Sequence, residues 1–190
     1  MPGFQFYFEL IGAVAFAISG AALAVKKHMD LFGVAMMGMT TAVGGGILRD
    51  LLLGITPPAA LRDPLQALVA IATSLLVFLV WKRFHPEGDH RNWEALLLVA
   101  DSIGLGIFSV HGAAVAIRAG LGGGVLRDLC CMERPYIFTK HIYACASLAG
   151  AAACMLLWSA GENLALLTGC ALTVVLRLCA AVFRWSLPKA

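Results

Sequence analysis

The chain has 190 residues, of which 61% are hydrophobic and only 13% are charged, and its mean hydropathy is +0.86. Soluble domains have roughly 45–50% apolar and about 25% charged residues, so this composition excludes a soluble protein and indicates an integral membrane protein. The net charge of +3 does not indicate nucleic-acid binding. The basic residues form short clusters between apolar runs, where such clusters set membrane topology.

Seven apolar runs can be distinguished along the chain, and a spanning helix takes about 20 residues. They cover residues 4–25, 31–53, 64–81, 93–116, 120–132, 142–158 and 164–183. The sequence therefore predicts an all-α membrane protein with seven transmembrane helices, and it leaves no room for a separate soluble domain.

The basic residues also predict the orientation of these helices. Seven spans place the termini on opposite sides, and the side that holds the C-terminus carries nine Lys and Arg residues. The other side carries Arg62 and at most Arg118. Basic residues concentrate in cytoplasmic loops, so we expect a cytoplasmic C-terminus and an outside N-terminus.

The sequence contains an internal repeat. The segment Gly44-Gly45-Gly46-Ile-Leu-Arg49-Asp50-Leu, followed by Pro57, recurs as Gly122-Gly123-Gly124-Val-Leu-Arg127-Asp128-Leu, followed by Pro135, at an offset of 78 residues. An earlier pair of segments, around Gly20 and Gly112, has an offset of 92 residues. We infer two three-helix units, 1–82 and 93–158, and a seventh helix at 162–185. Because each unit has an odd number of helices, the two units insert with opposite orientation as an inverted repeat.

The second unit is shorter than the first. The two offsets differ by 14 residues, and the loss falls between Ile117 and Gly122. The fifth helix is then about 14 residues, or roughly 21 Å, long, which is less than the roughly 30 Å of a bilayer core. We expect either a truncated fifth helix or a missing segment, with a discontinuity near Ile117–Arg118.

Glycine triplets in the middle of the second and fifth helices need an explanation, because each glycine weakens a helix by about 1 kcal/mol relative to alanine. They could kink or break the helix so that its carbonyls reach an ion, or they could allow close helix packing. Their symmetric placement favours the first interpretation. The candidate ion-binding positions are Gly44, Gly45, Gly46, Gly122, Gly123 and Gly124.

An Arg-Asp pair follows each triplet by about one helical turn, Arg49-Asp50 in the first unit and Arg127-Asp128 in the second. A charged residue inside a span costs about 2.5 to 3.5 kcal/mol on insertion scales and usually faces the bundle interior or water. These pairs could gate a pathway or set its charge. Alternatively, they are structural ion pairs that hold the helices together.

Two further polar pairs correspond between the units. Glu9 and Asp101 lie near the expected helix starts, where a carboxylate either stabilises the helix N-terminus or attracts cations to a pore mouth. Ser19 and His111 lie deeper, where they either line a pore or form buried hydrogen bonds between helices. The chain has no phosphate-binding loop, zinc-protease or serine-hydrolase motif, so we do not expect an enzyme.

The doubled Gly-Gly-Gly-x-Leu-Arg-Asp motif, with a proline seven residues after each Asp, resembles the bacterial branch of the trimeric intracellular cation (TRIC) channels, which are also labelled as glycine transporters. The resemblance implies a homotrimer in which each protomer has a pore between helices two and five, kinked at the two triplets. It also implies potassium as the main permeant ion, with sodium accepted. Animal relatives bind a phosphoinositide at a lysine-containing motif, which this chain replaces with glycine, so that dependence is not implied.

The leading hypothesis is therefore a passive channel for potassium and sodium in the inner membrane, in contact with lipid and without a cofactor. No Thr-Val-Gly-Tyr-Gly filter is present, so strict selectivity is not expected. The alternative is a secondary transporter of glycine or another small amino acid, since inverted repeats with broken helices are common in transporters. The Arg-Asp pairs would then bind the carboxylate and the ammonium group of the substrate.

Overall fold

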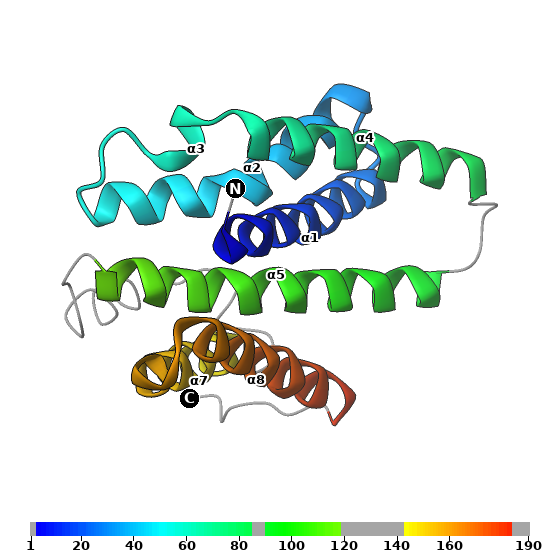
Figure 1. The fold of residues 1–190 in the computed structure, drawn as a ribbon. Coiled ribbons are helices and arrows are strands. Elements are labelled where there is room, and N and C mark those ends of the chain that lie inside the picture. Colours follow the sequence, from blue (N-terminus) through cyan, green and yellow to red (C-terminus); the bar gives the residue numbers. More distant parts are fainter. Residues whose placement is uncertain (1–2, 85–89, 119–142, 184–190) are drawn as a thin grey trace, which may run out of the picture. The chain divides into compact units, whose positions relative to one another are not determined.

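The structure, a computed structural model, describes residues 3–84, 90–118 and 143–183. All regular structure in these ranges is helical, which confirms the predicted all-α fold (Figure 1). The elements are α1 (Phe4–Lys26), α2 (Leu31–Leu52), α3 (Ala59–Arg62), α4 (Leu65–Phe84), α5 (His90–Arg118), α7 (Tyr143–Leu156), the 3-10 helix η2 (Trp158–Ala160) and α8 (Glu162–Val182).

Six of the predicted spans coincide with described helices. The helices α1, α2, α4, α5 and α8 are long and apolar enough to cross a membrane, and α7 contains the shorter apolar segment Cys145–Leu156. The predicted fifth span, 120–132, lies outside the described residues. Helix α5 ends at Arg118, and the residues that follow it lie outside the described part of the chain, so the discontinuity expected near Ile117–Arg118 stays a prediction.

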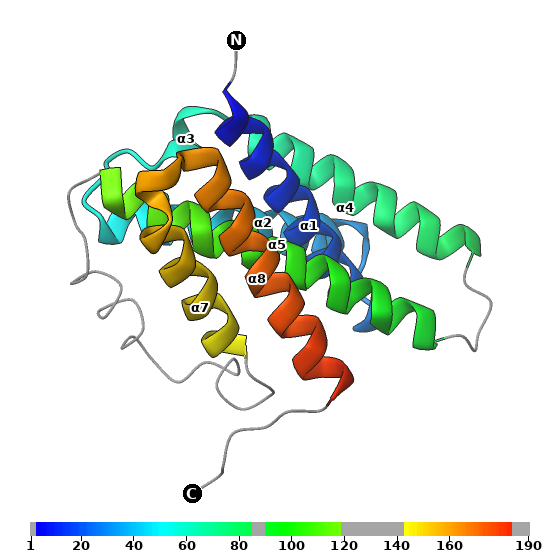
Figure 2. The ribbon, with the colours of Figure 1, turned by 60° about the horizontal axis from the view of Figure 1, so that its bottom comes forward.

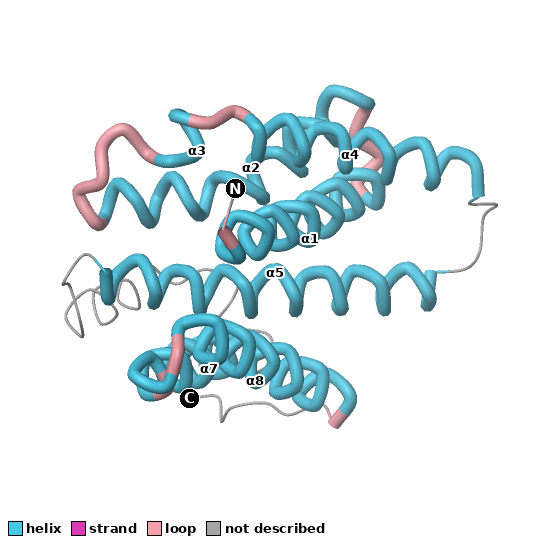
Figure 3. Tube along the Cα trace, in the orientation of Figure 1, coloured by secondary structure: helices cyan, strands magenta, loops and turns pink. Residues whose placement is uncertain are grey.

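The helices form two compact units, Met1–Gly104 and Leu105–Ala190, and α5 contributes residues to both. In unit 1, the helices α1, α2 and α4 all contact one another, and the short α3 joins α2 to α4 (Figures 1 and 3). The boundary between the units falls within α5. The limits of the two sequence repeats stay a prediction.

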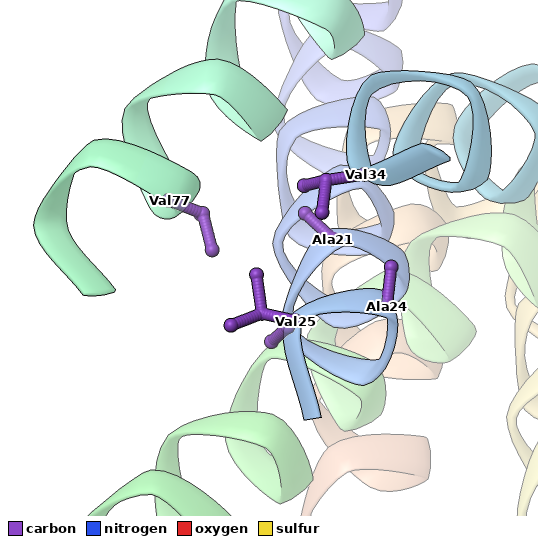
Figure 4. Close-up of a cluster of buried hydrophobic side chains, with 6 residues drawn as sticks. Ala21, Ala24, Val25, Val34 and Val77 are labelled. Carbon is purple, nitrogen blue, oxygen red and sulfur yellow. The ribbon is translucent and has the colours of Figure 1, made fainter. Parts of the chain in front are cut away.

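The hydrophobic core of unit 1 lies where α1, α2 and α4 meet. Its buried side chains are Ala21, Ala22, Ala24, Val25, Val34 and Val77 (Figure 4). Most of the α1 side chains in this cluster are alanines, so the neighbouring helices can approach closely. In lipid, where the hydrophobic effect does not drive helices together, tight packing through small residues is a main source of association.

Two glycines make this close approach possible. A Cβ atom at Gly20 of α1 would lie 2.8 Å from the carbonyl oxygen of Met37 in α2. A Cβ atom at Gly38 of α2 would overlap the hydroxyl of Ser74 in α4. That hydroxyl already donates a hydrogen bond to the carbonyl of Ala70, at 2.7 Å. Both glycines are therefore packing positions.

Unit 2 uses the same principle. Helices α7 and α8 pack along each other (Figure 2). A Cβ atom at Gly169 of α8 would lie only 2.6 Å from the carbonyl oxygen of Gly150 in α7. In the same unit, a Cβ atom at Gly106 of α5 would lie 3.1 Å from the carbonyl oxygen of Cys170. Glycine thus sets the helix spacing in both units.

The turn between α1 and α2 is tightly hydrogen-bonded. His28 adopts a left-handed conformation with φ of 55°. The amides of His28 and Met29 donate to the carbonyls of Val25 and Ala24, at 2.9 and 3.1 Å, which is the pattern of a Schellman motif. Asp30 then begins α2, because its side chain accepts a hydrogen bond from the amide of Gly33 at 2.7 Å. This turn fixes the end of α1.

Candidate functional site

The C-terminal end of α2 carries a buried ion pair between neighbouring residues. Arg49 donates to Oδ1 of Asp50 through Nε at 2.9 Å and through Nη2 at 2.8 Å. Arg49 is only 8% exposed and Asp50 only 2% exposed. Two charges removed from water need mutual pairing, because an isolated buried charge is strongly unfavourable.

The same aspartate also holds the next helix. Its second oxygen, Oδ2, accepts a hydrogen bond from the amide of Ala59, at 2.8 Å, in the first turn of α3. The backbone carbonyl of Asp50 accepts from the amide of Ile55 at 2.8 Å, and Arg62 donates to the carbonyl of Thr56 at 3.1 Å. The segment between α2 and α3 is thus anchored at three points, and Asp50 provides two of them.

These contacts support the structural interpretation of Arg49-Asp50, and they also fix the guanidinium in place. A guanidinium has five N–H donors. The two contacts with Asp50 engage only Nε and Nη2. Arg49 makes no other hydrogen bond or ion pair with the residues that the structure describes. Among the described residues, the remaining donors of this guanidinium have no partner.

The glycine triplet lies in the same helix, one turn before this pair. Helix α2 runs from Leu31 to Leu52 without interruption, so the triplet does not break the helix, and a kink at the triplet stays a prediction. The backbone hydrogen bonds of a helix, from each amide to the carbonyl four residues earlier, do not involve side chains. Packing of the rest of α2 keeps these bonds intact at the glycines. Its backbone carbonyls are therefore not freed by a helix end.

The triplet differs from the packing glycines in its surroundings. A Cβ atom at Gly44 would meet only the Cγ2 of Thr40, at 3.8 Å, and one at Gly46 would meet nothing within 4 Å. Within unit 1, neither glycine is needed to avoid a clash with another helix. Close packing inside this unit therefore does not explain Gly44 or Gly46.

Glu9 and Asp101 are not at helix N-termini. Helix α1 begins at Phe4 and α5 at His90, and neither helix has an acidic residue in its first turn. The capping interpretation is therefore wrong for both residues. Glu9 instead accepts a hydrogen bond from Gln66 of α4, with 3.3 Å between Oε2 and Nε2. Both carboxylates lie within candidate spans.

The remaining predicted residues are distributed over several parts of the chain. Ser19 is half-buried on α1 in unit 1, and His111 is buried on α5 in unit 2. The second triplet and the second pair, Gly122, Gly123, Gly124, Arg127 and Asp128, lie outside the described residues. Within the described ranges, no three His, Cys, Asp or Glu side chains are grouped as metal ligands.

Sequence reasoning missed two parts of this region. One is α3, a helix of only four residues, together with its hydrogen bond to Asp50. The adjacent Pro57 and Pro58 signal a turn there, since proline favours turns and helix starts. The other is Gln66, whose contact with Glu9 joins residues 57 positions apart and leaves no local sequence signal.

Long apolar helices with a buried ion pair among them are the features of an integral membrane protein. The family described as "Glycine transporter" matches two segments of the chain, residues 6–82 and 98–159. The chain belongs to this family.

Relatives agree with this assignment. The chain is 34% identical to the "UPF0126 inner membrane protein YadS" of Escherichia coli (strain K12), with 96% of this chain and 93% of the relative covered. That match extends over 199 positions, more than the 190 residues of this chain, so it includes positions that this chain lacks.

Two solved structures have the same fold. One, from work on conductance through TRIC cation channels, is 38% identical, covers 97% of this chain and 96% of its own, and has a TM-score of 0.75. The other is the TRIC trimeric intracellular cation channel orthologue from Rhodobacter sphaeroides, at 32% identity, 95% and 98% coverage and a TM-score of 0.79. The chain is thus a membrane protein of the TRIC family, and its relatives are channels and membrane proteins, not enzymes.

Proposed function

We propose that the protein is a passive channel for monovalent cations, potassium and sodium, in the inner membrane. The observation that carries this proposal is the open surrounding of Gly44 and Gly46 in a chain whose solved relatives are described as cation channels. Glycines that no packing contact of unit 1 requires leave room beside α2. A cation can pass there close to the helix backbone.

The continuous helix shapes the expected selectivity. Because α2 is not interrupted at the triplet, its carbonyls keep their helical hydrogen bonds and do not form a rigid ring of ion ligands. An ion that moves along this surface keeps part of its water shell. Discrimination between potassium and sodium should then be weak, since strict selectivity requires replacement of the hydration shell.

Arg49 would set the charge of the pathway near the end of α2. Asp50 holds its guanidinium in place and lowers, without removing, its effect on a passing cation, because the repulsion of a paired arginine is reduced. The equivalent roles in the second repeat fall to Gly122, Gly123, Gly124, Arg127 and Asp128. Ser19 and His111 would line the pathway, and Glu9 and Asp101 would attract cations to it.

The proposed oligomer and its location are based on the same relatives. We propose a homotrimer with one pore in each protomer, between the second and the fifth span, and with the C-terminus in the cytoplasm. The name of the Rhodobacter sphaeroides structure supports the trimer, and the inner-membrane name of the Escherichia coli relative supports the location.

Single-channel recording of the purified protein in a planar bilayer tests this proposal. With a potassium chloride gradient and no organic solute, we expect unitary current steps whose reversal potential follows potassium. Replacement of potassium by sodium on one side should shift the reversal potential only slightly. The absence of steps, combined with gradient-driven uptake of labelled glycine by liposomes that contain the same preparation, would instead establish a secondary transporter.

A further inference from the structure

Positive charge gathers at one end of unit 1, where α1 and α4 both end. We call this group the basic end, and its members are the exposed residues Lys27, His28, Lys82 and Arg83. The residues just before them, Val25 on α1 and Trp81 on α4, belong to or pack against the same hydrophobic cluster. The two helix ends therefore lie side by side.

The cations at this end differ in their partners. Nζ of Lys26 lies 3.0 Å from Oε1 of Glu94, so that charge is paired. Lys27, Lys82 and Arg83 form no ion pair with any residue that the structure describes. A helix C-terminus favours nearby cations, but its partial charge is only about half an elementary charge. The basic end thus keeps a net positive charge.

Exposed apolar side chains directly precede these cations on both helices. Leu23 on α1 is 48% exposed, and Leu76 and Leu79 on α4 are 61% and 62% exposed. In a bilayer, such residues contact acyl chains, which places the cations that follow them at the level of the headgroups. Trp81, between the apolar stretch and Lys82, is a residue type that concentrates at this interface.

We propose that the basic end binds the phosphate group of an anionic phospholipid. Arg83 suits a phosphate because a guanidinium can donate two parallel hydrogen bonds, while Lys27 and Lys82 act as point charges. The exposed leucines would contact the acyl chains of the same lipid. A soluble phosphate would use the cations but not the apolar surface, so the combination favours the lipid. This inference does not depend on the proposed channel function.

Quenching of tryptophan fluorescence by brominated lipids tests the site locally. The full-length protein, with Trp93, Trp158 and Trp185 replaced by phenylalanine, keeps Trp81 as its reporter. Quenching is compared between dibrominated phosphatidylglycerol and dibrominated phosphatidylcholine in mixed bilayers. We expect a several-fold preference for phosphatidylglycerol, because each Lys or Arg near an anionic surface strengthens the attraction by roughly fivefold.

Two sets of substitutions separate the site from general surface charge. Replacing Lys27, Lys82 and Arg83 by glutamine should remove the preference, so that the two brominated lipids quench Trp81 about equally. The matched control, Lys26→Gln with Glu94→Gln, removes the paired cation together with its carboxylate and should keep the preference. Unchanged preference in the triple variant, or equal loss in the control, would overturn the proposal.

Two further measurements cover the alternatives. Displacement of phosphatidylglycerol by millimolar inorganic phosphate would assign the basic end to a soluble anion and would overturn the lipid assignment. In the protein with its basic end intact, the preference should fall as sodium chloride is raised, since salt screens exposed charges. A preference that does not respond to salt would also contradict the proposal, even if the triple variant failed to fold.

Discussion

The two halves of α2 use glycine for opposite purposes. In the first half, Gly38 lets α4 approach so closely that a Cβ atom would overlap the hydroxyl of Ser74. In the second half, a Cβ atom at Gly46 would meet nothing within 4 Å. A glycine in a membrane helix therefore cannot be interpreted from its residue type alone. What matters is the distance to the next helix.

The second half of the helix is held by polar contacts instead. Asp50 is hydrogen-bonded to Arg49 and to the first turn of α3, and both members of the ion pair are almost fully buried. The helix is thus held by close packing at Gly38 and by hydrogen bonds at Asp50, while a Cβ atom added at Gly44 or Gly46 between them would meet no other helix of unit 1. This arrangement combines a rigid element with an unobstructed surface.

Loss of the Asp50 carboxylate should have the largest effect. Asp50→Ala leaves the guanidinium of Arg49 buried without its counter-charge and removes the anchor of α3, so we expect destabilisation by about 3–5 kcal/mol. The thermal midpoint in detergent measures this. The double variant Arg49→Gln with Asp50→Asn, which buries no charge, should be less destabilised than Asp50→Ala. If the single variant were as stable as the wild type, the anchoring role would be wrong.

Gly38→Ala should be the next largest change. The new methyl group collides with Ser74, and overpacking of this kind typically costs about 1–3 kcal/mol. The same thermal assay measures the loss. Adding Ser74→Gly to this variant should restore part of the stability, because the colliding hydroxyl is removed. A Gly38→Ala variant without any loss would show that the first half of α2 is not closely packed.

Gly46→Ala should have the opposite sign. Its methyl group enters open space within unit 1, and alanine is favoured over glycine in a helix by about 1 kcal/mol. We therefore expect a slightly raised thermal midpoint, in contrast to Gly38→Ala. A drop of similar size in both variants would remove the difference between the two halves of the helix.

Disruption of the exposed ion pair of unit 1 should have the smallest effect on stability. It serves as a reference for the buried pair of Arg49 and Asp50. Lys26 and Glu94 have side chains that are 30% and 65% exposed, and pairs of this kind contribute about 0–1 kcal/mol. Lys26→Gln should therefore shift the thermal midpoint far less than Asp50→Ala. Comparable shifts would mean that burial does not distinguish the two pairs.

Hydropathy was sufficient to predict the six apolar helices that the structure describes, because a spanning segment must be both long and apolar. It did not predict where each helix begins. Helix α5 begins at His90, three residues before the apolar run that starts at residue 93, and Asp101 lies well inside both. Polar residues that continue a helix into the interface are not marked by hydropathy.

The chemistry of the site was only partly predictable. The Arg49-Asp50 motif identified the charged residues, because charges are rare inside spans. The contact between Asp50 and Ala59 depends on the path of the segment between α2 and α3, which no local pattern specifies. The uninterrupted helix at the triplet was also missed, because glycine lowers helix propensity while neighbouring turns keep the helix intact.

The central claim is that the surface beside the α2 triplet conducts ions. The most direct test is the single-channel conductance of Gly46→Leu, compared with Ala72→Leu, which adds bulk to an exposed position of α4. We predict that Gly46→Leu loses most of its conductance while its thermal midpoint and oligomer size stay unchanged, and that Ala72→Leu conducts like the wild type. Full conductance of a folded Gly46→Leu protein would contradict the account.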